Sequence, residues 1–120
     1  MPLQSKLFAG DRALQACSAQ DSAHVTLNAK GEHISKIQTA LFVLDKISVA
    51  PNELRTETYG PSTAAAVLAY KQRRNIVNLA YQTRPDNIVG KITIARMDSE
   101  MLVAEKLPPL PNPNHQPVST

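Results

Sequence analysis

The clearest pattern in the chain is an apolar stripe at helical spacing between residues 32 and 44. The stripe consists of Ile34, Ile37, Leu41 and Leu44. This spacing predicts an amphipathic helix over 32–44 that turns the stripe toward a core. Asn28 and Gly31, just before it, tolerate a positive φ angle, so a turn is predicted there. Residues 24–27 alternate and include β-branched side chains, which predicts a short extended segment.

A second helix is predicted to begin at Pro61 and to run to residue 72. Gly60 occupies the cap position, and proline fits the first helical position because its missing N–H is not needed there. The hydroxyls of Ser62 and Thr63 are expected to serve the free N–H groups of the first turn. Alanines dominate the next positions and lose little entropy on becoming helical. The residues that share one face are Thr63, Val67 and Tyr70. We expect this face to form the middle of the core.

The start of this second helix also resembles the signature of the small peptidoglycan-binding domain. In that family the run is typically Phe-Gly-x-x-Thr-x-x-Ala-Val-x-x-Phe-Gln. The matching residues here are Tyr59-Gly60, Thr63, Ala66-Val67 and Tyr70. Gln72 lies one residue later than the glutamine of the family, because Lys71 intervenes.

Two further blocks resemble the same family and occur in the expected order. The first family block, Leu-x-x-x-Gly before Val-x-x-Leu-Gln-x-x-Leu, is matched by Leu27, Gly31, Ile34, Ile37, Gln38 and Leu41. The last block, Asp-Gly-x-Val-Gly, resembles residues 86–90, where Asn87 replaces glycine at a position expected to need a positive φ angle. A helix over 91–98 follows, with Thr93 and Met97 at family positions, and Asp98 or Ser99 can cap a continuation of it. The resemblance spans residues 24–98 and implies a mostly α fold, a compact three-helix peptidoglycan-binding-domain-like bundle.

The chain is therefore divided into an N-terminal arm (1–23), the domain (24–106) and a tail (107–120). Two alternatives stay open for the arm. It is either an extended arm or a short helix capped by Asp11. In the helical alternative, a lid packs on the domain through Leu7, Phe8, Leu14 and Cys17. The tail holds five of the nine prolines, so it is predicted to be disordered.

Two connections inside the domain complete the prediction. Residues 45–57 are expected to form a connection with a turn at Pro51-Asn52, while Ile47 and Leu54 tuck inward. Residues 78–85 have no counterpart in the family and are treated as a loop insertion, a kind of segment that often carries function.

Composition limits the class of protein. The chain has 120 residues, of which 42% are hydrophobic but only 4% aromatic, so one domain with an aliphatic core is expected. A single cysteine excludes an internal disulfide. No stretch is apolar and long enough to span a membrane, and the N-terminus does not resemble a signal peptide. Localisation therefore stays open; the resemblance implies the cell envelope or a non-classical export route.

The sequence offers no arrangement typical of catalysis or of metal binding. His24, His33 and His115 are dispersed without cysteine or carboxylate partners at ligand spacing. No phosphate-binding glycine loop is present. We therefore predict a protein that is not an enzyme and that has no metal and no cofactor.

Binding is then the remaining kind of function, and a basic cluster marks one candidate surface. Lys71, Arg73, Arg74 and Arg84 surround the end of the second helix and form either a solvated face or a contact surface for an anion or glycan. A tyrosine in the following loop can stack on a sugar ring, and nearby amides supply donors and acceptors. The candidate ligand-binding residues are Tyr81, Gln82, Arg74, Arg73, Asn78 and Asn87.

The family resemblance implies a non-catalytic module that binds peptidoglycan or another cell-wall glycan as an accessory or targeting protein. The alternative is a protein–protein adaptor or structural subunit, of a secretion or phage-like apparatus for example, that reuses the fold without glycan binding. Such a module would contact its partner through the N-terminal arm, the 78–85 loop or the tail. Three short helices can mimic a helix-turn-helix, but a net charge of +3 without a dense basic run argues against nucleic acid.

Overall fold

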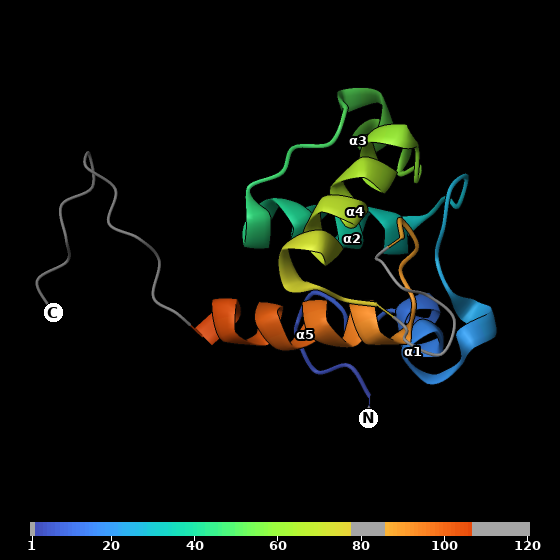
Figure 1. Ribbon diagram of the computed structural model, residues 1–120. Coiled ribbons are helices and arrows are strands. Elements are labelled where there is room, and N and C mark those ends of the chain that lie inside the picture. The colour runs from blue at the N-terminus through green and yellow to red at the C-terminus, as the bar shows by residue number, and fades with distance from the viewer. Residues whose placement is uncertain (1, 78–85, 107–120) are drawn as a thin grey trace, which may run out of the picture.

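A computed structural model describes residues 2–77 and 86–106 of the chain (Figure 1). Its helices are α1 (Arg12–Ala19), the 3₁₀ helix η1 (Asp21–Ala23), α2 (Glu32–Asp45), α3 (Pro51–Thr56), α4 (Pro61–Arg74) and α5 (Lys91–Lys106). The mostly α fold class is confirmed, but these ranges hold five α-helices where three were predicted. They contain no regular strand, only isolated antiparallel bridges that join Val25 to Val89 and Lys30 to Thr58. The predicted 78–85 loop and 107–120 tail lie outside the described residues.

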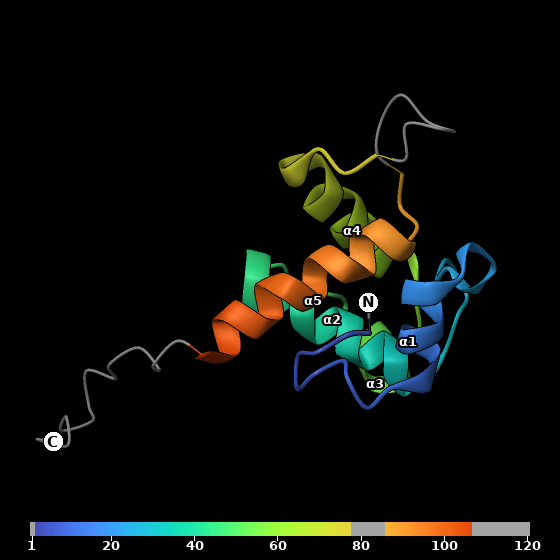
Figure 2. The same cartoon turned by 90° about the horizontal axis from the view of Figure 1, so that it is seen from below.

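The helices pack around α5 and α2. Helix α5 packs against both α1 and α2, and α2 also packs against α4. Figures 1 and 2 show α1 beside the first turns of α5, and α3 at the end of the molecule away from α5. Both predicted apolar faces point into the shared core, where the largest fully buried apolar side chains are Tyr59, Tyr70, Phe8, Leu14, Ile34, Ile37, Leu41, Ile94, Met97, Val67 and Val89.

The N-terminal residues belong to this core, so the extended-arm alternative is wrong. Asp11 caps α1 by accepting a hydrogen bond from the Leu14 backbone N–H at 3.0 Å, as the helical alternative predicted. Cys17 is buried, which raises the pKa of its thiol to about 11. Backbone N–H groups of Gln4 and Ser5 donate to the carboxylate of Asp98 at 2.8–3.1 Å. These bonds fix the N-terminal segment along α5.

The same contact explains why α5 runs past the predicted end at residue 98. The side chain of Asp98 is buried and serves the N-terminal segment, so it does not start a new helix. Helix α5 therefore continues without a break to Lys106. The prediction of a cap at Asp98 or Ser99 is wrong.

The segment 45–57 was predicted as a connection, but it contains α3. Pro51 occupies the first turn of this short helix, as proline does in α4. Leu54 was expected to tuck inward and is instead 46% exposed, whereas Glu53 is buried. The helix thus turns a carboxylate, not its leucine, toward the rest of the protein.

Backbone conformation agrees with the predicted turn at 28–31 but not with that at Asn87. Asn28 and Gly31 adopt φ angles of 75° and 134°. Asn87 is not among the described residues with a positive φ angle, so that prediction is wrong. Asn75 has a φ of 54° and ends α4, where its N–H bonds back to the carbonyls of Gln72 and Lys71.

Candidate functional site

The start of α4 is held by the buried carboxylate of Glu53 from α3. One carboxylate oxygen, Oε1, accepts hydrogen bonds from the Gly60 and Thr63 backbone N–H groups at 3.1 and 2.9 Å. The other, Oε2, accepts from the Ser62 N–H at 3.0 Å. The predicted capping by the hydroxyls of Ser62 and Thr63 is wrong: Ser62 Oγ instead accepts from the Ala50 N–H at 2.9 Å. A carboxylate at a helix N-terminus is also favoured by the helix dipole.

A directed chain of hydrogen bonds links this carboxylate to α2. The Thr63 hydroxyl donates to Glu53 Oε1 at 2.8 Å, because an ionised carboxylate can only accept. That hydroxyl therefore accepts from Gln38 Nε2, which lies 3.0 Å away. The same Nε2 also faces the carbonyl oxygens of Thr58 and Glu53 at 3.1 and 3.4 Å. Three acceptors thus fix the orientation of the Gln38 carboxamide.

The orientation leaves Gln38 Oε1 without a donor. Gln38 is 2% exposed, and its Oε1 is buried and accepts no hydrogen bond from the described residues. Turning the amide over would place this oxygen against three acceptors, which is unfavourable. A buried acceptor without a partner is rare, because it costs its full desolvation free energy.

The Glu53 cap makes the stability of the protein depend on pH. Burial by itself raises the pKa of Glu53, but hydrogen bonds from Ser62 and Thr63 outweigh it and lower the pKa from 4.5 to about 2. Because the folded-state pKa lies below the unfolded value, the stabilisation is complete above pH 4.5 and is lost as the pH falls toward about 2. The shift corresponds to on the order of 3 kcal/mol of unfolding free energy. The free energy of unfolding, measured with urea, should fall as the pH is lowered through this window, and it should fall less steeply in Glu53→Gln, in which Glu100 still contributes. Equal slopes in both proteins would contradict the assignment.

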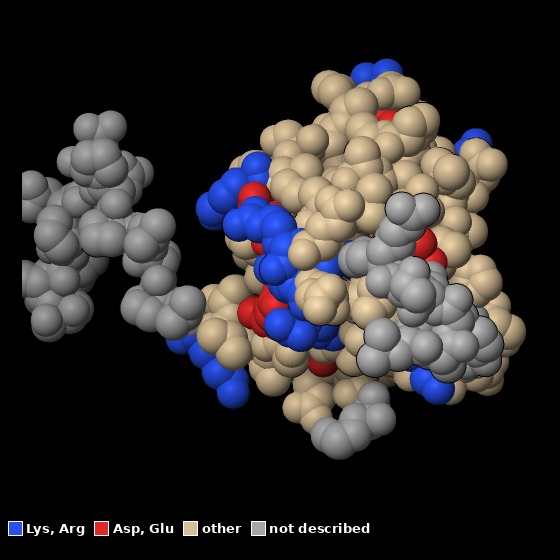
Figure 3. All heavy atoms as spheres, viewed as in Figure 1, with Lys and Arg blue, Asp and Glu red and all other residues tan. Residues whose placement is uncertain are grey.

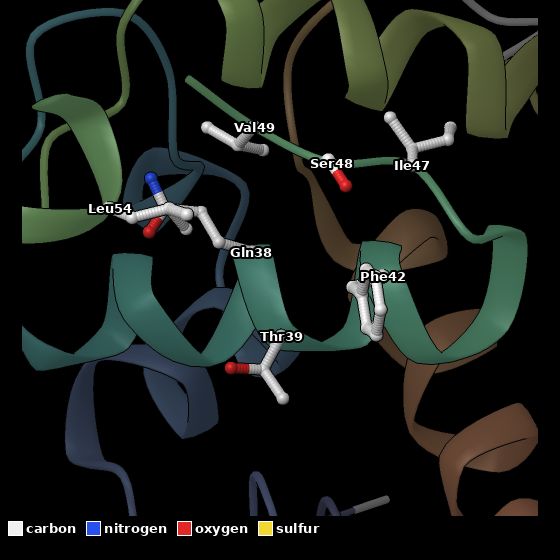
Figure 4. A pocket seen from close by; sticks show the side chains of 7 residues that line it. All are labelled: Gln38, Thr39, Phe42, Ile47, Ser48, Val49 and Leu54. Atoms are coloured by element: carbon white, nitrogen blue, oxygen red, sulfur yellow. The ribbon is translucent and has the colours of Figure 1, made fainter. Parts of the chain in front are cut away.

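Gln38 also lines a surface hollow of about 290 Å³ between α2, α3 and the connecting segment 46–50. Figure 4 shows the side chains that surround it, namely Gln38, Thr39, Phe42, Ile47, Ser48, Val49 and Leu54. Phe42 and Leu54 are 53% and 46% exposed, although both are large apolar residues. Lys46 Nζ lies 6.0 Å from the centre of the Phe42 ring. The hollow is thus an apolar recess with a carboxamide in its wall and a cation at its rim.

The basic cluster at the end of α4 is mostly engaged within the protein. Arg74 is 15% exposed in its side chain and forms ion pairs with Asp45 at 2.7 Å and with Glu100 at 2.8 Å. Its guanidinium also lies 3.7 Å from the centre of the Tyr70 ring. Burial lowers the pKa of Arg74, but the bonds to Asp45 and Glu100 outweigh it and hold the pKa above its usual range. Figure 3 shows basic and acidic atoms interleaved on this face.

Lys71 is buried rather than part of a basic surface. Its Nζ donates to Asp86 Oδ1 at 2.6 Å and to the Ile88 carbonyl oxygen at 2.8 Å. Together these bonds tie the end of α4 to the segment that leads into α5. The Tyr59 hydroxyl donates to the Asn87 carbonyl oxygen nearby. Lys71 therefore positions the chain and leaves its charge inside the protein.

Of the six predicted ligand-binding residues, the structure describes three. Arg73 is 64% exposed and lies 3.8 Å from Asp45, so its guanidinium is accessible. Arg74 is committed to its ion pairs, and Asn87 is half-buried with its carbonyl bonded to Tyr59. The other three predicted residues, Asn78, Tyr81 and Gln82, lie outside the described residues.

The hollow was not predicted from the sequence, although one signal points to it. Phe42 falls off the stripe that Ile34, Ile37 and Leu41 define, so it cannot share their core-facing side. Together with the exposed Leu54 across the hollow, Phe42 forms part of an apolar patch, and such a patch can mark a contact surface. Phe42 also lies one helical turn before Asp45, the partner of Arg73, so the hollow and this arginine flank the same end of α2.

Neither a metal site nor a membrane-spanning helix is present in the described part of the chain. Within residues 2–77 and 86–106, no group of three or more histidine, cysteine, aspartate or glutamate side chains could hold a metal ion. Over the same ranges, every helix is too short or too polar to cross a bilayer. Comparisons with protein-family models, curated proteins and solved structures gave no match.

Proposed function

We propose that this chain is a non-catalytic module that binds bacterial cell-wall peptidoglycan and serves as an accessory or targeting protein. The observation that carries the proposal is a contact between residues of two separate signature blocks. Gln38 comes from the first block and Thr63 from the second, and they are joined by a 3.0 Å hydrogen bond. The bridge between Val25 and Val89 brings the edges of the first and last blocks together as well. Contact between these blocks supports the resemblance to the family, and the choice of ligand rests on analogy with that family alone.

The accessible groups around the C-terminal end of α2 suit such a polymer. The hollow offers apolar walls, which can hold a methyl group or the face of a sugar ring. Lys46 is exposed at its rim, and Arg73 is exposed near the C-terminal end of α2, where it lies 3.8 Å from Asp45. Peptidoglycan carries carboxylates on its peptide stems. A long polymer can contact the hollow and these cations together, because both lie at one end of α2.

Sedimentation with purified peptidoglycan sacculi tests the proposal. The wild-type protein should pellet with sacculi in a saturable way, beyond an unrelated basic protein of similar size. Arg73→Ala is expected to lower the affinity about threefold to tenfold, because it removes one exposed contact. Tyr81→Ala is expected to have a similar effect, because the sequence predicts that this tyrosine stacks on a sugar ring. Arg73 is the informative arginine here, since truncating Arg74 would also disturb the fold. A pelleted fraction equal to that of the unrelated protein would contradict the proposal.

One observation favours the alternative of a protein–protein adaptor. Phe42 and Leu54, which both line the hollow, are large, exposed apolar side chains, as at many protein interfaces. An adaptor would bind a partner protein through this surface and would not pellet with sacculi. The same sedimentation experiment therefore separates the two functions.

A further inference from the structure

The segment that joins α2 to α3 carries backbone groups without a partner in the described part of the chain. Residues 46–50 form no helix and no turn. At the two ends of this segment, the N–H groups of Lys46 and Ala50 donate to acceptors in α2 and α4, both at 2.9 Å. Between them, the backbone N–H and C=O groups of Ser48 and Val49 make no hydrogen bond with the described residues. Ser48 is exposed, and unpaired backbone groups normally face water, so its pair of groups is open to a ligand.

This unpaired backbone lies along the hollow. Ser48 and Val49 line the hollow together with Phe42 from α2 and Leu54 from α3. Figure 4 shows the segment on one side of the hollow and α2 on the other, with the Ser48 side chain turned toward α2. In an extended pair of chains, one residue exchanges both its N–H and its C=O bond with the residue opposite. Ser48 can therefore pair with one residue of an extended peptide, which is a common mode of peptide recognition.

The exposed charges around the hollow are positive. From Phe42 to the end of α3 the chain holds four charged residues, namely Asp45, Lys46, Glu53 and Arg55. The two carboxylates are buried and bonded to Arg74 and to the start of α4. Lys46 and Arg55 are exposed, and Lys46 Nζ lies 6.0 Å from the centre of the Phe42 ring. This arrangement favours a ligand that carries carboxylates.

We propose that the hollow and the unpaired backbone of Ser48 bind the peptide stem of peptidoglycan, an inference that rests on the proposed function above. One stem residue exchanges two backbone hydrogen bonds with Ser48. The methyl group of a stem alanine packs in the hollow against Phe42. Carboxylates of the stem lie near Lys46 and Arg55. The volume of about 290 Å³ is near the lower end of ligand sites, which suits one small side chain.

Two features favour the stem over other ligands. The glycan strand of intact peptidoglycan is uncharged where its lactyl groups carry stems, so it offers no partner to the exposed cations. A strand of a partner protein is usually about five to six residues long. The unpaired edge lies between the bonded N–H groups of Lys46 and Ala50, a stretch of about 10 Å in extended chain. A short acidic peptide therefore matches the edge, the hollow and the charges together.

Competition against sacculi tests the proposal. An amidase that cuts between the lactyl group and the stem converts peptidoglycan into soluble glycan strands and free stem peptides. The strands then carry lactyl carboxylates of their own, so the comparison does not depend on charge alone. The stems should release the wild-type protein from intact sacculi at least about fivefold more effectively than the strands. Stems that compete no better than the strands would overturn the stem subsite but leave peptidoglycan binding intact, and a wild-type protein that does not pellet with sacculi would remove both proposals.

Titration of the ¹⁵N-labelled protein with a synthetic stem locates the contact. The probe is N-acetyl-L-alanyl-γ-D-glutamyl-meso-diaminopimelyl-D-alanine. The backbone amide signals of Ser48 and Val49 should shift in the wild-type protein. Ser48→Pro should weaken stem binding about fivefold to tenfold more than Ser48→Ala does, because only proline removes the N–H. Shifts confined to residues away from the hollow, or equal affinities of the two variants, would overturn the subsite.

Two further comparisons test the charge and the class of ligand. Lys46→Ala should weaken stem binding about threefold, whereas Lys91→Ala removes an exposed lysine that does not line the hollow and should bind like the wild type. Equal effects of the two lysine variants would contradict the placement of the stem carboxylates. A blocked peptide of alternating threonine and glutamate, twice as long as the stem, should bind no more tightly than the stem, because its extra residues find no unpaired backbone. Tighter binding of this longer peptide would assign the hollow to a partner protein.

Discussion

Replacing Glu53 with alanine is expected to lower the free energy of unfolding by about 3 kcal/mol. The change removes the acceptor of three backbone N–H groups at the start of α4 and of the Thr63 hydroxyl. Those donors are mostly buried, so water cannot replace the carboxylate without opening the structure. Urea unfolding at neutral pH, followed by circular dichroism, measures the loss.

Two further variants show whether the loss comes from the cap. Glu57→Ala removes a half-buried carboxylate that accepts no hydrogen bond from the described residues, and it should change stability by less than about 0.5 kcal/mol. Gly60→Ala should destabilise the protein by about 1–3 kcal/mol, since a Cβ atom there would lie 2.5 Å from Glu53 Cδ. In the Glu53→Ala variant, adding Gly60→Ala should lower the free energy of unfolding by much less than it does in the wild type. Additive losses in the double variant would contradict the role of Glu53.

Arg74→Ala is expected to cost about 3 kcal/mol of unfolding free energy. The side chain of Asp45 is 2% exposed, so without the guanidinium its charge would remain buried, and among the described residues its remaining ion-pair partner would be Arg73 at 3.8 Å. The change also removes the bond to Glu100, whose pKa is lowered by Arg74 and Tyr70 against the opposing effect of burial. Thermal and urea unfolding measure the loss.

Arg74→Lys and Arg73→Ala are the matched controls for this ion-pair network. Lysine keeps the charge but not the forked donors that reach both carboxylates, so an intermediate loss of about 1–2 kcal/mol is expected. Arg73→Ala should change stability by less than about 0.5 kcal/mol, because its side chain is 64% exposed and its contact to Asp45 is 3.8 Å. Equal losses of unfolding free energy for Arg73→Ala and Arg74→Ala would contradict the special role of Arg74 in the ion-pair network.

Local periodicity predicted those parts of the fold that are amphipathic over several turns. The stripe of α2 and the buried face of α4 follow from spacing alone, because helical geometry places such residues together. Helix α3 was not predicted because six residues are too few to form a stable helix alone. Its Glu53 is held by backbone N–H groups at the start of α4. The N-terminal segment is held by Asp98, more than ninety residues away along the chain. Local sequence patterns cannot predict a contact at this separation.

The candidate site was harder to predict because it depends on packing. The arginine pair at the end of α4 looked like one basic surface, yet the fold pairs Arg74 with two carboxylates and leaves Arg73 accessible. The hollow forms where residues 46–50 cross over α2, which sequence spacing does not reveal. The sequence singled out Gln38 as a residue of the family signature. That its Oε1 accepts no hydrogen bond from the described residues is visible only in the structure, where Nε2 is held by Thr63 and neighbouring carbonyl groups.

The most direct test of peptidoglycan binding at this hollow compares two exposed apolar residues in one sedimentation titration with sacculi. Phe42→Ala removes the side chain at the rim of the hollow, and Val103→Ala removes one on α5 that does not line it; their side chains are 53% and 59% exposed. We expect Phe42→Ala to weaken binding about tenfold with little change in stability, and Val103→Ala to bind like the wild type. Equal affinity of all three proteins for sacculi, or no binding by the wild type, would contradict the account.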